Sequence, residues 1–477
     1  MGEVRDTIVS VLGVLQWPLL AYMIALNAIY TVLIVTGWRS VHRYVTMRPL
    51  RDYAYVGGSP LSMPVSILVP AHNEEPTIVD SVRALLRSRY GQLEIVVIND
   101  GSTDETIAAL TAGFGLVPVE CVPRSGLATA EVRGVLASTV DDRVVVIDKA
   151  GGGKADALNC GINYAQFPLV CAIDADTLLD TGALSRLVWE FQSHPDTVAT
   201  GGIVRVVNGS IVEDGLVSEI RTPRTLLESI QVMEYLRAFL GGRLAWSRWN
   251  MLLIISGAFG LFRRDVLVEA GGYDTSTVSE DAELILRVRR DRADRGLPCR
   301  ITFFPDPICW TQAPNSARVL VRQRDRWQRG LGEMLLMHRR MLFRRRYGRT
   351  GWIALPYYWL FEFLEPVITV VGVVLVTIGL IAGSVEPFVY VLILALATAY
   401  GLFLSLGVIL LEERAFRRYP QWRDLLQLSI AVLAENFGYR QWQAWVRFRA
   451  TGRALFRGSR HRGVWGAMPR SSFTSAP

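Results

Sequence analysis

Two aspartates separated by one residue follow an apolar stretch near the middle of the chain. The stretch from Pro168 to Ile173 runs directly into Asp174, and Asp176 comes two positions later. Side chains two positions apart on an extended chain point the same way, so both carboxylates can face one hard cation with oxygen ligands. A magnesium or manganese ion held there could bridge a diphosphate. The same pattern of two aspartates also fits a turn at the end of a strand, with both carboxylates solvated.

The four residues DADT also fit a second chemistry. They match the DxDxT motif of haloacid-dehalogenase-type phosphatases, in which the first aspartate is a nucleophile and the second is an acid/base. Such a motif normally opens its domain. Here several complete strand-and-helix patterns precede it, and their ends suit a nucleotide.

Polar residues also follow three earlier apolar runs. Ala71, Asn73 and Glu74 come after VSILVP, Asp100 ends EIVVIND, and Lys154 belongs to the loop KAGGGKADALN that follows RVVVID. Each apolar run precedes a helical pattern, which predicts a βαβ sheet with mainly parallel strands. Ligands of such sheets sit beyond the carboxyl ends of the strands, where glycine amides and lysines can meet phosphate. We therefore expect an anionic ligand and a metal at this edge, although the glycine loop also fits a flexible connection.

The segment STVSEDAELILRVRRD places two acids at the start of a predicted helix. Ser279 is the expected N-cap, and Glu280 and Asp281 occupy the first turn. A helix N-terminus lowers the pKa of a carboxylate, which would keep a general base ionised and directed at an acceptor hydroxyl. Acidic first turns are also common in helices that have no catalytic role.

A basic amphipathic helix is predicted after Ser316. Its apolar stripe lies between arginines, and it carries Gln323, Arg326 and Trp327. One interpretation is a helix at the membrane surface, with Trp327 as interfacial anchor and Arg326 as headgroup contact. The functional interpretation places the same residues at the bilayer-side mouth of an active site.

Composition indicates a membrane protein. The chain has 477 residues, 51% of them hydrophobic, and a mean hydropathy of +0.26. Thr7 to Trp38 carries no charged residue and is long enough to span a bilayer, so we interpret it as a retained anchor. Pro366 to Val385 and Pro387 to Leu411 predict a transmembrane hairpin. Arginines flank these segments on the side of the large central domain, so the positive-inside rule predicts that this domain is cytoplasmic.

Several classes of site are disfavoured. The net charge of +7 is explained by arginines that flank the membrane, and no motif supports a nucleic-acid partner. The five cysteines show no CxxC spacing, which fits a reducing compartment and no zinc site. The predicted organisation is a transmembrane anchor (1–40), a cytoplasmic catalytic domain (41–315), interface helices carrying QRDRW (316–350), a transmembrane hairpin (351–412) and a basic cytoplasmic, interfacial or re-entrant tail (413–477).

Taken in order, these motifs resemble those of the membrane-embedded family 2 glycosyltransferases, the synthases of cellulose, hyaluronan, chitin-like and poly-N-acetylglucosamine chains. The similarity runs from Pro64 to the hairpin. Its elements are SILVPAHNEE, VVINDGSTDET, a GGK loop, a DxD, SGAFGLFRRD, SED and QRDRW. The triplet begins with serine where the family has threonine, and the lysine loop has one extra glycine.

The resemblance implies an α/β GT-A-type fold, a Rossmann-like mixed sheet, with a UDP-sugar donor and Mg²⁺ or Mn²⁺. Asp281 would be the general base, beside Glu280, and the reaction would invert the anomeric carbon by direct displacement. Asp174 and Asp176 would hold the metal and UDP. The implied substrate-binding residues are Ala71, Asn73, Glu74 and Asp100 near the uridine, Lys154 near the donor, and Gln323, Arg326 and Trp327 at the leaving diphosphate and the acceptor end.

The expected function is that of a processive β-glycosyltransferase in the plasma membrane. It would extend and export a polysaccharide from a UDP-sugar, with UDP-N-acetylglucosamine the expected donor. The expected partners are a growing glycan or a lipid acceptor, the bilayer and an accessory membrane protein. The alternatives are a single-addition glycosyltransferase acting on a lipid, a DxDxT phosphatase or phosphotransferase, and a transporter or sensor with a nucleotide-binding domain.

Overall fold

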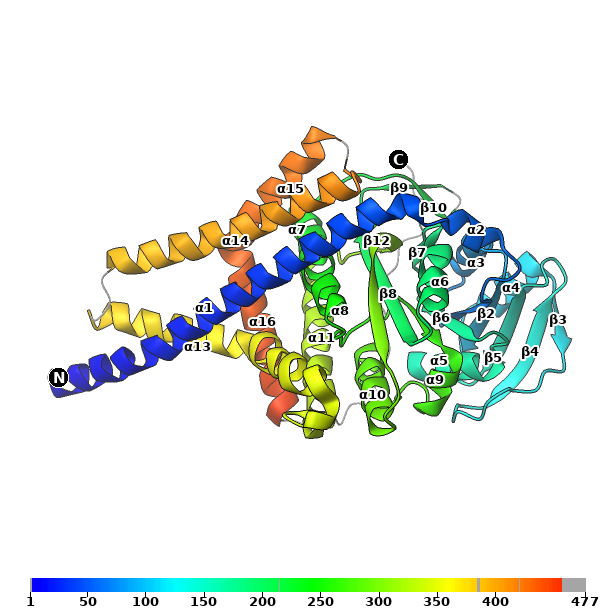
Figure 1. Cartoon of the computed structure of the whole chain (residues 1–477), viewed down its shortest axis with the longest axis horizontal. Helices are drawn as coiled ribbons and strands as arrows, with labels where there is room; N and C mark the ends of the chain where they lie inside the picture. The colour runs from blue at the N-terminus through cyan, green and yellow to red at the C-terminus, as the bar shows by residue number, and fades with distance from the viewer. Residues whose placement is uncertain (1, 214, 384–386, 420, 457–477) are drawn as a thin grey trace.

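A ten-stranded mixed sheet lies at the centre of the large domain (Figure 1). The computed structural model describes residues 2–213, 215–383, 387–419 and 421–456. The order of strands is β3-β4-β5-β2-β1-β6-β11-β8-β12-β7. The strands are β1 (Val65–Ala71), β2 (Leu93–Asp100), β3 (Leu116–Val119), β4 (Val132–Ser138), β5 (Val144–Lys149), β6 (Leu169–Ile173), β7 (Leu178–Leu179), β8 (Thr197–Val206), β11 (Phe259–Arg263) and β12 (Arg300–Thr311).

The four neighbouring strands β5, β2, β1 and β6 pair in parallel, as the alternation of apolar runs and helical patterns predicts. β1, β2 and β6 are buried along their whole length, which is typical of parallel strands covered on both faces. Outside this group the pairing is largely antiparallel, with β4 on β5 and β11 between β6 and β8. The predicted α/β fold with a mixed sheet is confirmed.

Helices connect and cover these strands. A separate hairpin is formed by β9 (Ile211–Glu213) and β10 (Leu216–Glu219). The helices that position the site begin at strand ends or close to the membrane segments. They are α3 (Ile78–Leu86), α4 (Thr106–Phe114), α5 (Lys154–Tyr164), α6 (Ala183–Ser193), α7 (Leu226–Leu236), the π-helix η2 (Arg237–Arg243), α8 (Leu244–Arg248), α9 (Arg264–Glu269), α10 (Glu280–Asp294) and α11 (Ala317–Met337).

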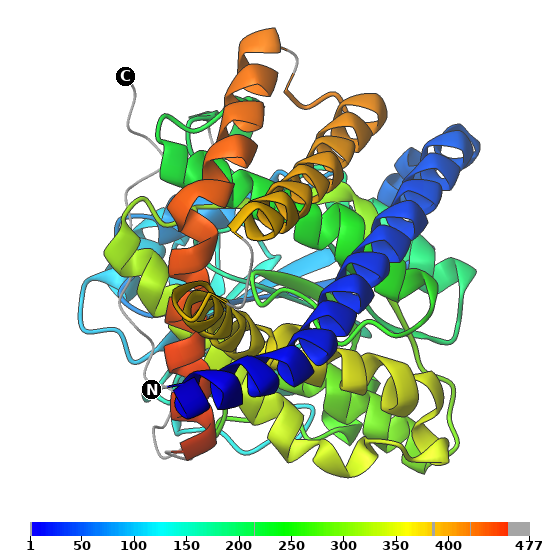
Figure 2. The ribbon, with the colours of Figure 1, turned by 90° about the vertical axis from the view of Figure 1, so that its left-hand side faces the viewer.

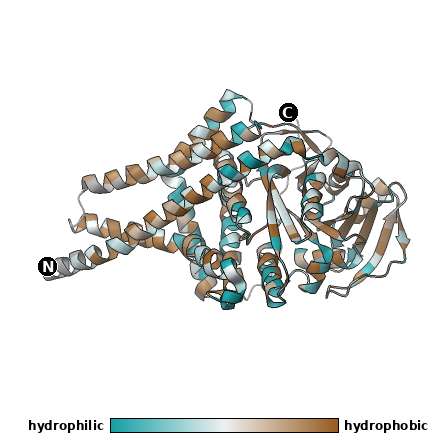
Figure 3. Cartoon of the chain, in the orientation of Figure 1, coloured by the Kyte–Doolittle hydropathy of each residue, from teal (hydrophilic) through white to brown (hydrophobic). Residues whose placement is uncertain are grey.

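Three long helices, α1 (Gly2–Met47), α13 (Glu365–Ile381) and α14 (Pro387–Ala415), project together from the sheet domain (Figures 1 and 2). Within the described residues two segments are long and apolar enough to cross a membrane, Gly13–Leu50 and Leu394–Ala415. A third span exists if Thr350–Phe363 and α13, bent by 45° at their junction, act as one. The projecting parts of α13 and α14 are largely apolar along their surfaces (Figure 3). These helices support membrane association.

The chain beyond α14 returns to the sheet domain. It forms α15 (Trp422–Ala434), the π-helix η7 (Glu435–Tyr439) and α16 (Arg440–Phe456). α16 packs on α11: Gln328 donates to Thr451 at 2.9 Å, and Arg447 donates to Gln328 at 3.0 Å. The part of the predicted tail after residue 456 lies outside the described residues. The described part of this C-terminal segment therefore packs against α11, the helix that carries QRDRW.

A buried aspartate joins the anchor, the sheet and the hairpin. Asp306 on β12 has no solvent exposure, and its Oδ2 accepts from the Tyr44 hydroxyl at 3.1 Å. Three guanidinium groups surround it, from Arg48 at 3.5 Å, Arg186 at 3.7 Å and Arg418 at 3.9 Å. Because these partners come from α1, the 3-10 turn Arg48–Leu50 that follows it, α6 and the segment after α14, this charge cluster fixes the sheet domain against the projecting helices.

Candidate active site

A fully buried lysine at the end of β5 organises the edge of the sheet. Lys149 Nζ lies 2.5 Å from Asp100 Oδ1 and 2.7 Å from Asp156 Oδ1, and it donates to the Ala150 carbonyl at 2.6 Å. Burial alone would lower the pKa of Lys149, but hydrogen bonds to Asp100 and Asp156 outweigh it and raise that pKa. Lys149 and Lys154 are the only lysines in the chain. A compact ammonium with three donors suits this enclosed site better than a planar guanidinium does.

Removing this charge should destabilise the domain. Lys149→Met leaves two buried carboxylates facing each other, which is expected to lower the free energy of unfolding by about 3–5 kcal/mol. Lys149→Arg should also destabilise, because the larger fork cannot enter the same space. Thermal unfolding of the purified protein measures both. Arg143→Met, which removes a partly exposed pair with Asp141, is the matched control and should cost under about 1 kcal/mol. An unchanged unfolding midpoint in Lys149→Met would contradict this role.

The glycine loop after β5 is bound to Asp100. The amides of Gly152 and Gly153 donate to the two Asp100 carboxylate oxygens at 2.9 and 2.7 Å. The expectation that the loop offers free amides to phosphate is therefore wrong for these two groups. Gly153 has φ +90°, a conformation that favours glycine, immediately before α5 begins at Lys154. The loop thus orients Lys154 towards the next strand end.

The residues after β1 bind the loop after β2. Asn73, with φ +57°, accepts at its Oδ1 from the Thr103 amide at 2.8 Å. The Glu74 amide donates to Thr106 Oγ1 at 3.0 Å, and the Glu74 carboxylate accepts from Thr77 at 3.0 Å. Ala71 is buried at the end of the strand. The Asn73 side chain is exposed at this edge of the sheet, whereas the side chains of Ala71 and Glu74 are buried beneath it.

Lys154 joins the DxD residues to the start of α10. Its Nζ lies 2.5 Å from Asp174 Oδ1 and 3.7 Å from Glu280 Oε1, and it donates to the Gly257 carbonyl at 3.0 Å. Burial opposes the charge of Lys154, but Asp174 and Glu280 outweigh that effect and raise its pKa. The Lys154 ammonium therefore links Asp174, directly after β6, with the SED segment, which lies more than a hundred residues further along the sequence.

The second DxD aspartate is in an electrostatically unfavourable position. Burial, together with repulsion from Asp174, raises the pKa of Asp176 to about 6. A divalent cation would relieve this stress, because it stabilises both carboxylates in their charged form. Mg²⁺ is commonly bound by one or two carboxylates plus substrate phosphates. Asp174 and Asp176 fit that arrangement, with diphosphate oxygens and water as the further ligands. No cluster of three or more metal-ligating side chains occurs in the part of the chain that the structure describes.

The SED segment begins α10 as predicted, with Ser279 at the N-cap position and Glu280 and Asp281 in the first turn. The Ser279 hydroxyl makes no capping bond to the helix. Asp281 Oδ1 accepts from the Ala282 amide at 2.8 Å. A Cβ atom at Gly257 would lie 3.0 Å from Asp281 Oδ2 and 3.4 Å from Lys154 Nζ. The close approach of Gly257 thus brings the backbone of the SGAFG segment against both charged side chains.

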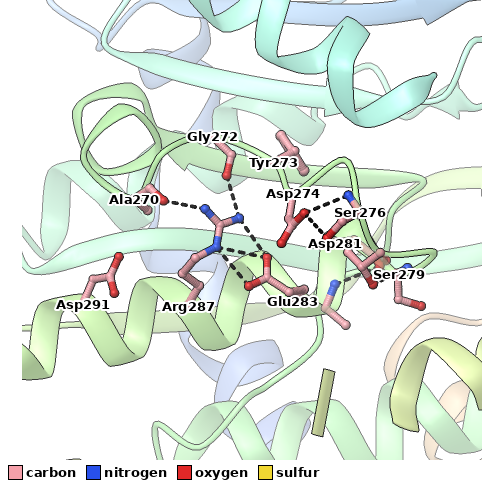
Figure 4. Close-up of polar contacts among 12 residues, drawn as sticks. Ala270, Gly272, Tyr273, Asp274, Ser276, Ser279, Asp281, Glu283, Arg287 and Asp291 are labelled. Atoms are coloured by element: carbon pink, nitrogen blue, oxygen red, sulfur yellow. Dashed lines mark hydrogen bonds and ion pairs between the residues drawn. The ribbon is translucent and has the colours of Figure 1, made fainter. Parts of the chain in front are cut away.

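An ion-pair network fixes α10 behind the site (Figure 4). Arg287 donates to the carbonyls of Ala270 and Gly272, the latter at 2.7 Å, and pairs with Glu283 at 2.8 Å. His338 Nε2 lies 3.1 Å from the same Glu283. Burial opposes the charge on Glu283, but His338 and Arg287 outweigh it and lower its pKa. The first turn of α10 is therefore held from both sides.

The helix that carries QRDRW packs directly on the SED segment. A Cβ atom at Gly330 would fall 1.8 Å from Ser279 Oγ and 2.6 Å from Ser279 Cβ, so any larger residue at position 330 would require Ser279 to move. Glu333, one turn further on, accepts from the Thr277 hydroxyl and the Val278 amide, each at 3.3 Å. Gln323 lies two turns before Gly330, on the same face of α11.

Some polar side chains of QRDRW form contacts with residues of other helices. Gln323 is buried, and its Oε1 has no hydrogen-bond partner in the described structure. Arg324 pairs with Glu234 of α7, and its guanidinium lies 4.6 Å from the centre of the Trp327 ring. Trp327 is 40% exposed. Arg326, one residue before it, makes no ion pair with any residue that the structure describes.

The contact at Gly330 gives a sharp prediction. Gly330→Ala should displace Ser279 and with it Asp281, lowering activity by at least about tenfold while the protein still folds. Ser279→Gly removes the Oγ and Cβ atoms that obstruct the new methyl group, so the double variant should recover activity. Gly452→Ala in α16, where no atom lies within 4 Å of the added Cβ, is the control. Full activity of the single Gly330→Ala variant would contradict the close contact.

The structure thus brings Lys154, Asp174, Glu280 and Asp281 together. Lys154, Gly257, Tyr273, Glu280 and Asp281 line one narrow cavity. Gln323, Arg326 and Trp327 belong to the helix against SED, whereas Ala71, Asn73, Glu74 and Asp100 lie at the ends of β1 and β2. The sequence analysis counted Lys149 among the loop lysines that could meet phosphate, whereas the structure buries it between Asp100 and Asp156. It did not single out Gly257 and Gly330. A glycine inside a helical pattern, as at Gly330, is the signal that could have drawn attention to it.

Comparison with solved structures defines the class of fold. The chain resembles the mannosyltransferase PcManGT from Pyrobaculum calidifontis, solved in complex with GDP-Man and Mn²⁺, with a TM-score of 0.51 and 20% sequence identity. The match covers 88% of this chain and 99% of that one. At this identity the likeness establishes the fold, a GT-A-type glycosyltransferase domain, as predicted.

The sequence places the chain within that class. Residues 66–148 match the family described as Glycosyl transferase family 2, and residues 119–330 match Glycosyltransferase like family 2. Between residues 66 and 330 the chain therefore carries family 2 glycosyltransferase domains, and the resemblance predicted from its motifs is confirmed. The alternatives of a phosphatase and of a transporter lose their support, because DADT follows β6 inside the region that matches the glycosyltransferase family.

Curated relatives share the catalytic region. The probable glycosyltransferase YdaM of Bacillus subtilis is 31% identical over 271 residues, which is 56% of this chain and 54% of YdaM. The poly-beta-1,6-N-acetyl-D-glucosamine synthase of Staphylococcus aureus is 30% identical over 274 residues, 57% of this chain and 55% of the synthase. The corresponding Staphylococcus epidermidis synthase is 28% identical over 272 residues, with 57% and 55% covered. The chain spans about half the length of the curated relatives it matches.

Proposed function

We propose that this protein transfers a sugar from a UDP-sugar, UDP-N-acetylglucosamine, to the end of a growing β-linked glycan. The observation that carries the proposal is the convergence of Lys154, Asp174, Glu280 and Asp281, with the QRDRW helix packed on the SED segment through Gly330 and Ser279. The poly-N-acetylglucosamine synthases among its relatives support the choice of sugar.

In the proposed mechanism Asp281 is the general base. Its carboxylate accepts the proton of the acceptor hydroxyl as that oxygen forms a bond to the anomeric carbon of the donor. The bond between that carbon and the diphosphate oxygen breaks at the same time, so UDP leaves and the configuration inverts. Glu280, beside Lys154, helps to hold that ammonium near the donor. Burial raises the pKa of Glu280, as does Asp281 next to it, while Lys154 opposes the rise.

Asp174 and Asp176 would hold a divalent metal, Mg²⁺ or Mn²⁺, which when bound stabilises the negative charge of the leaving diphosphate. Lys154 and Arg326 would supply further positive charge on the same side of the reaction. Asn73, Glu74, Ala71 and Asp100 would border the uridine, because the ends of parallel strands present their loops to the nucleotide. Gln323 and Trp327 would hold the acceptor end.

The membrane helices suggest on which side of the membrane the reaction takes place and where the product leaves. We place the catalytic domain in the cytoplasm, where the nucleotide sugar is made, and expect the product to leave through the plasma membrane beside α1, α13 and α14. Arginines near Trp38 and after Met337 support this orientation. An accessory membrane protein could complete the export path.

A donor panel tests the proposal. Purified protein should incorporate label from UDP-N-acetylglucosamine at least about tenfold faster than from UDP-glucose or GDP-mannose, with UDP released in equal amount. Preference for GDP-mannose would overturn the donor assignment. Release of inorganic phosphate without sugar transfer would overturn the reaction class.

A further inference from the structure

A second cavity, of about 290 Å³, lies where the end of α1 meets α8 and the start of β12. Its walls are the last two turns of α1, the short helix α8 and the first half of β12, together with residues at the end of α6. Small-molecule pockets in proteins begin at roughly this volume. The cavity shares no lining residue with the narrow cavity at the candidate active site.

The second cavity opens at the edge of the sheet opposite to the candidate active site. Arg300 begins β12 and is paired with Thr197 at the beginning of β8, and these two strands run parallel. β11 is antiparallel to both β8 and β6, so β8 and β6 run in the same direction. Asp174 follows the last residue of β6 and therefore lies at the other edge. A ligand in the second cavity would be separate from the sugar donor.

The lining of the second cavity is basic. Four of its residues are arginines: Arg43, Arg51, Arg248 and Arg300. Arg300 pairs with Glu190 at 3.0 Å, and Arg51 makes one side-chain hydrogen bond, to a tyrosine hydroxyl at 3.2 Å. Arg43 and Arg248 are exposed and have neither an ion pair nor a side-chain hydrogen bond with any residue that the structure describes. Two arginines on facing walls are thus available to a ligand.

The charge balance of the lining indicates the charge of that ligand. Two carboxylates, from Glu190 and Asp196, line the cavity beside the four guanidinium groups, which leaves an excess of two positive charges. Like charges around one cavity repel each other unless an anion lies between them. A phosphate monoester carries a charge of about −1.5 to −2 at neutral pH, which would balance the excess. Guanidinium groups also match the geometry of phosphate oxygens, to which they donate two parallel hydrogen bonds.

The remaining lining suits a small, hydroxylated organic group. The carboxylate of Asp196 has no partner among the described residues and can accept from a hydroxyl. The Ser247 hydroxyl accepts from the Phe303 amide at 2.8 Å and keeps its own proton to donate. The buried rings of Phe303 and Phe304 add apolar surface. Alternating hydroxyl and carbon surface is the chemistry of a sugar or a glycerol unit.

We propose that this cavity binds a small phosphate monoester, with Arg43 and Arg248 as the main contacts of the phosphate group. The site does not depend on the proposed function, because it lies away from the residues assigned to catalysis. A soluble sugar phosphate and the lipid phosphatidic acid present the same monoester group, and the experiment distinguishes these two sources.

Equilibrium binding tests the site, measured by calorimetry on the full-length protein in phosphatidylcholine nanodiscs. Glucose 6-phosphate should bind with a dissociation constant below about 1 mM and inorganic phosphate should compete with it, whereas glucose should not bind. Arg43→Gln combined with Arg248→Gln should weaken glucose 6-phosphate binding at least about tenfold, because charge-assisted hydrogen bonds are lost. Lysine at both positions keeps the charge and should preserve part of the affinity. Arg248→Gln alone should weaken binding about threefold or more, and it carries the test if the double variant does not fold.

Arg83→Gln on α3 is the matched control, because this exposed arginine does not line the cavity. It should bind glucose 6-phosphate like wild type, as should Asp176→Asn. Loss of binding in Asp176→Asn would place the ligand at the catalytic edge and overturn the proposal. Wild-type affinity in the variants without Arg248, or no saturable binding to the wild-type protein, would also overturn it.

The lipid composition of the nanodiscs then identifies the source of the phosphate. If phosphatidic acid in the discs abolishes glucose 6-phosphate binding to the wild-type protein, the site is a phosphate site filled by a lipid headgroup. If binding persists in these discs, the site takes a soluble phosphate ester. Either result supports the site, provided that the two arginines are required for binding.

Discussion

Asp281→Asn is expected to lower sugar transfer by about 10²–10⁴-fold while UDP binding remains at the wild-type level. The amide cannot accept the proton of the acceptor hydroxyl, which is the contribution that a general base makes to the rate. The asparagine side chain has nearly the same size as the aspartate, and its oxygen can accept the same hydrogen bond from the Ala282 amide. The helix should therefore keep its position. Initial rates with labelled UDP-N-acetylglucosamine and calorimetry with UDP measure the two effects.

Asp291→Asn on the same helix is the matched control, because this partly exposed residue pairs only with its neighbour Arg290 among the residues described. It should retain wild-type activity. If Asp281→Asn transferred sugar at the normal rate, another group would have to be the base. If the variant lost UDP binding in parallel with activity, Asp281 would belong to the donor side.

Removing the divalent metal should lower activity by at least about 10²-fold, because the leaving diphosphate would lose the charge that stabilises it. Chelation with EDTA followed by addition of Mg²⁺ or Mn²⁺ tests the requirement and its reversal. Asp176→Asn should abolish the response to added metal, since it removes one of the two carboxylates proposed to hold the ion. The exposed Asp80→Asn is the control. Undiminished transfer in EDTA would show that Lys154 and Arg326 suffice without a metal.

The centre of the fold could be predicted because its sequence signal is local. Runs of valine and isoleucine such as EIVVIND and RVVVID fix buried strands, and the helical patterns between them require crossover connections. The antiparallel strands β4 and β11 lacked such a signal. β4 is mostly half-exposed, and β11 is five residues long and follows an irregular segment, so their partners depend on tertiary contacts.

The candidate site divides in the same way. Acidic and basic residues at strand ends or helix starts could be identified from position alone, as with Asp174 and Asp281. The roles of the two lysines could not be separated from sequence, because they lie five residues apart in one loop. Burial distinguishes them: Lys149 is enclosed by Asp100 and Asp156, while Lys154 reaches Asp174.

Our central proposal is that this protein transfers sugars to the end of a growing glycan, and we propose further that it adds many sugars before the chain is released. The most direct test is the length distribution of the product at limiting enzyme. The purified protein in lipid nanodiscs is incubated with labelled UDP-N-acetylglucosamine, and products are separated by size before one donor equivalent per acceptor is consumed. The account predicts long chains beside unextended acceptor. A product one sugar long that partitions into organic solvent would contradict it and would identify a single-addition enzyme acting on a lipid.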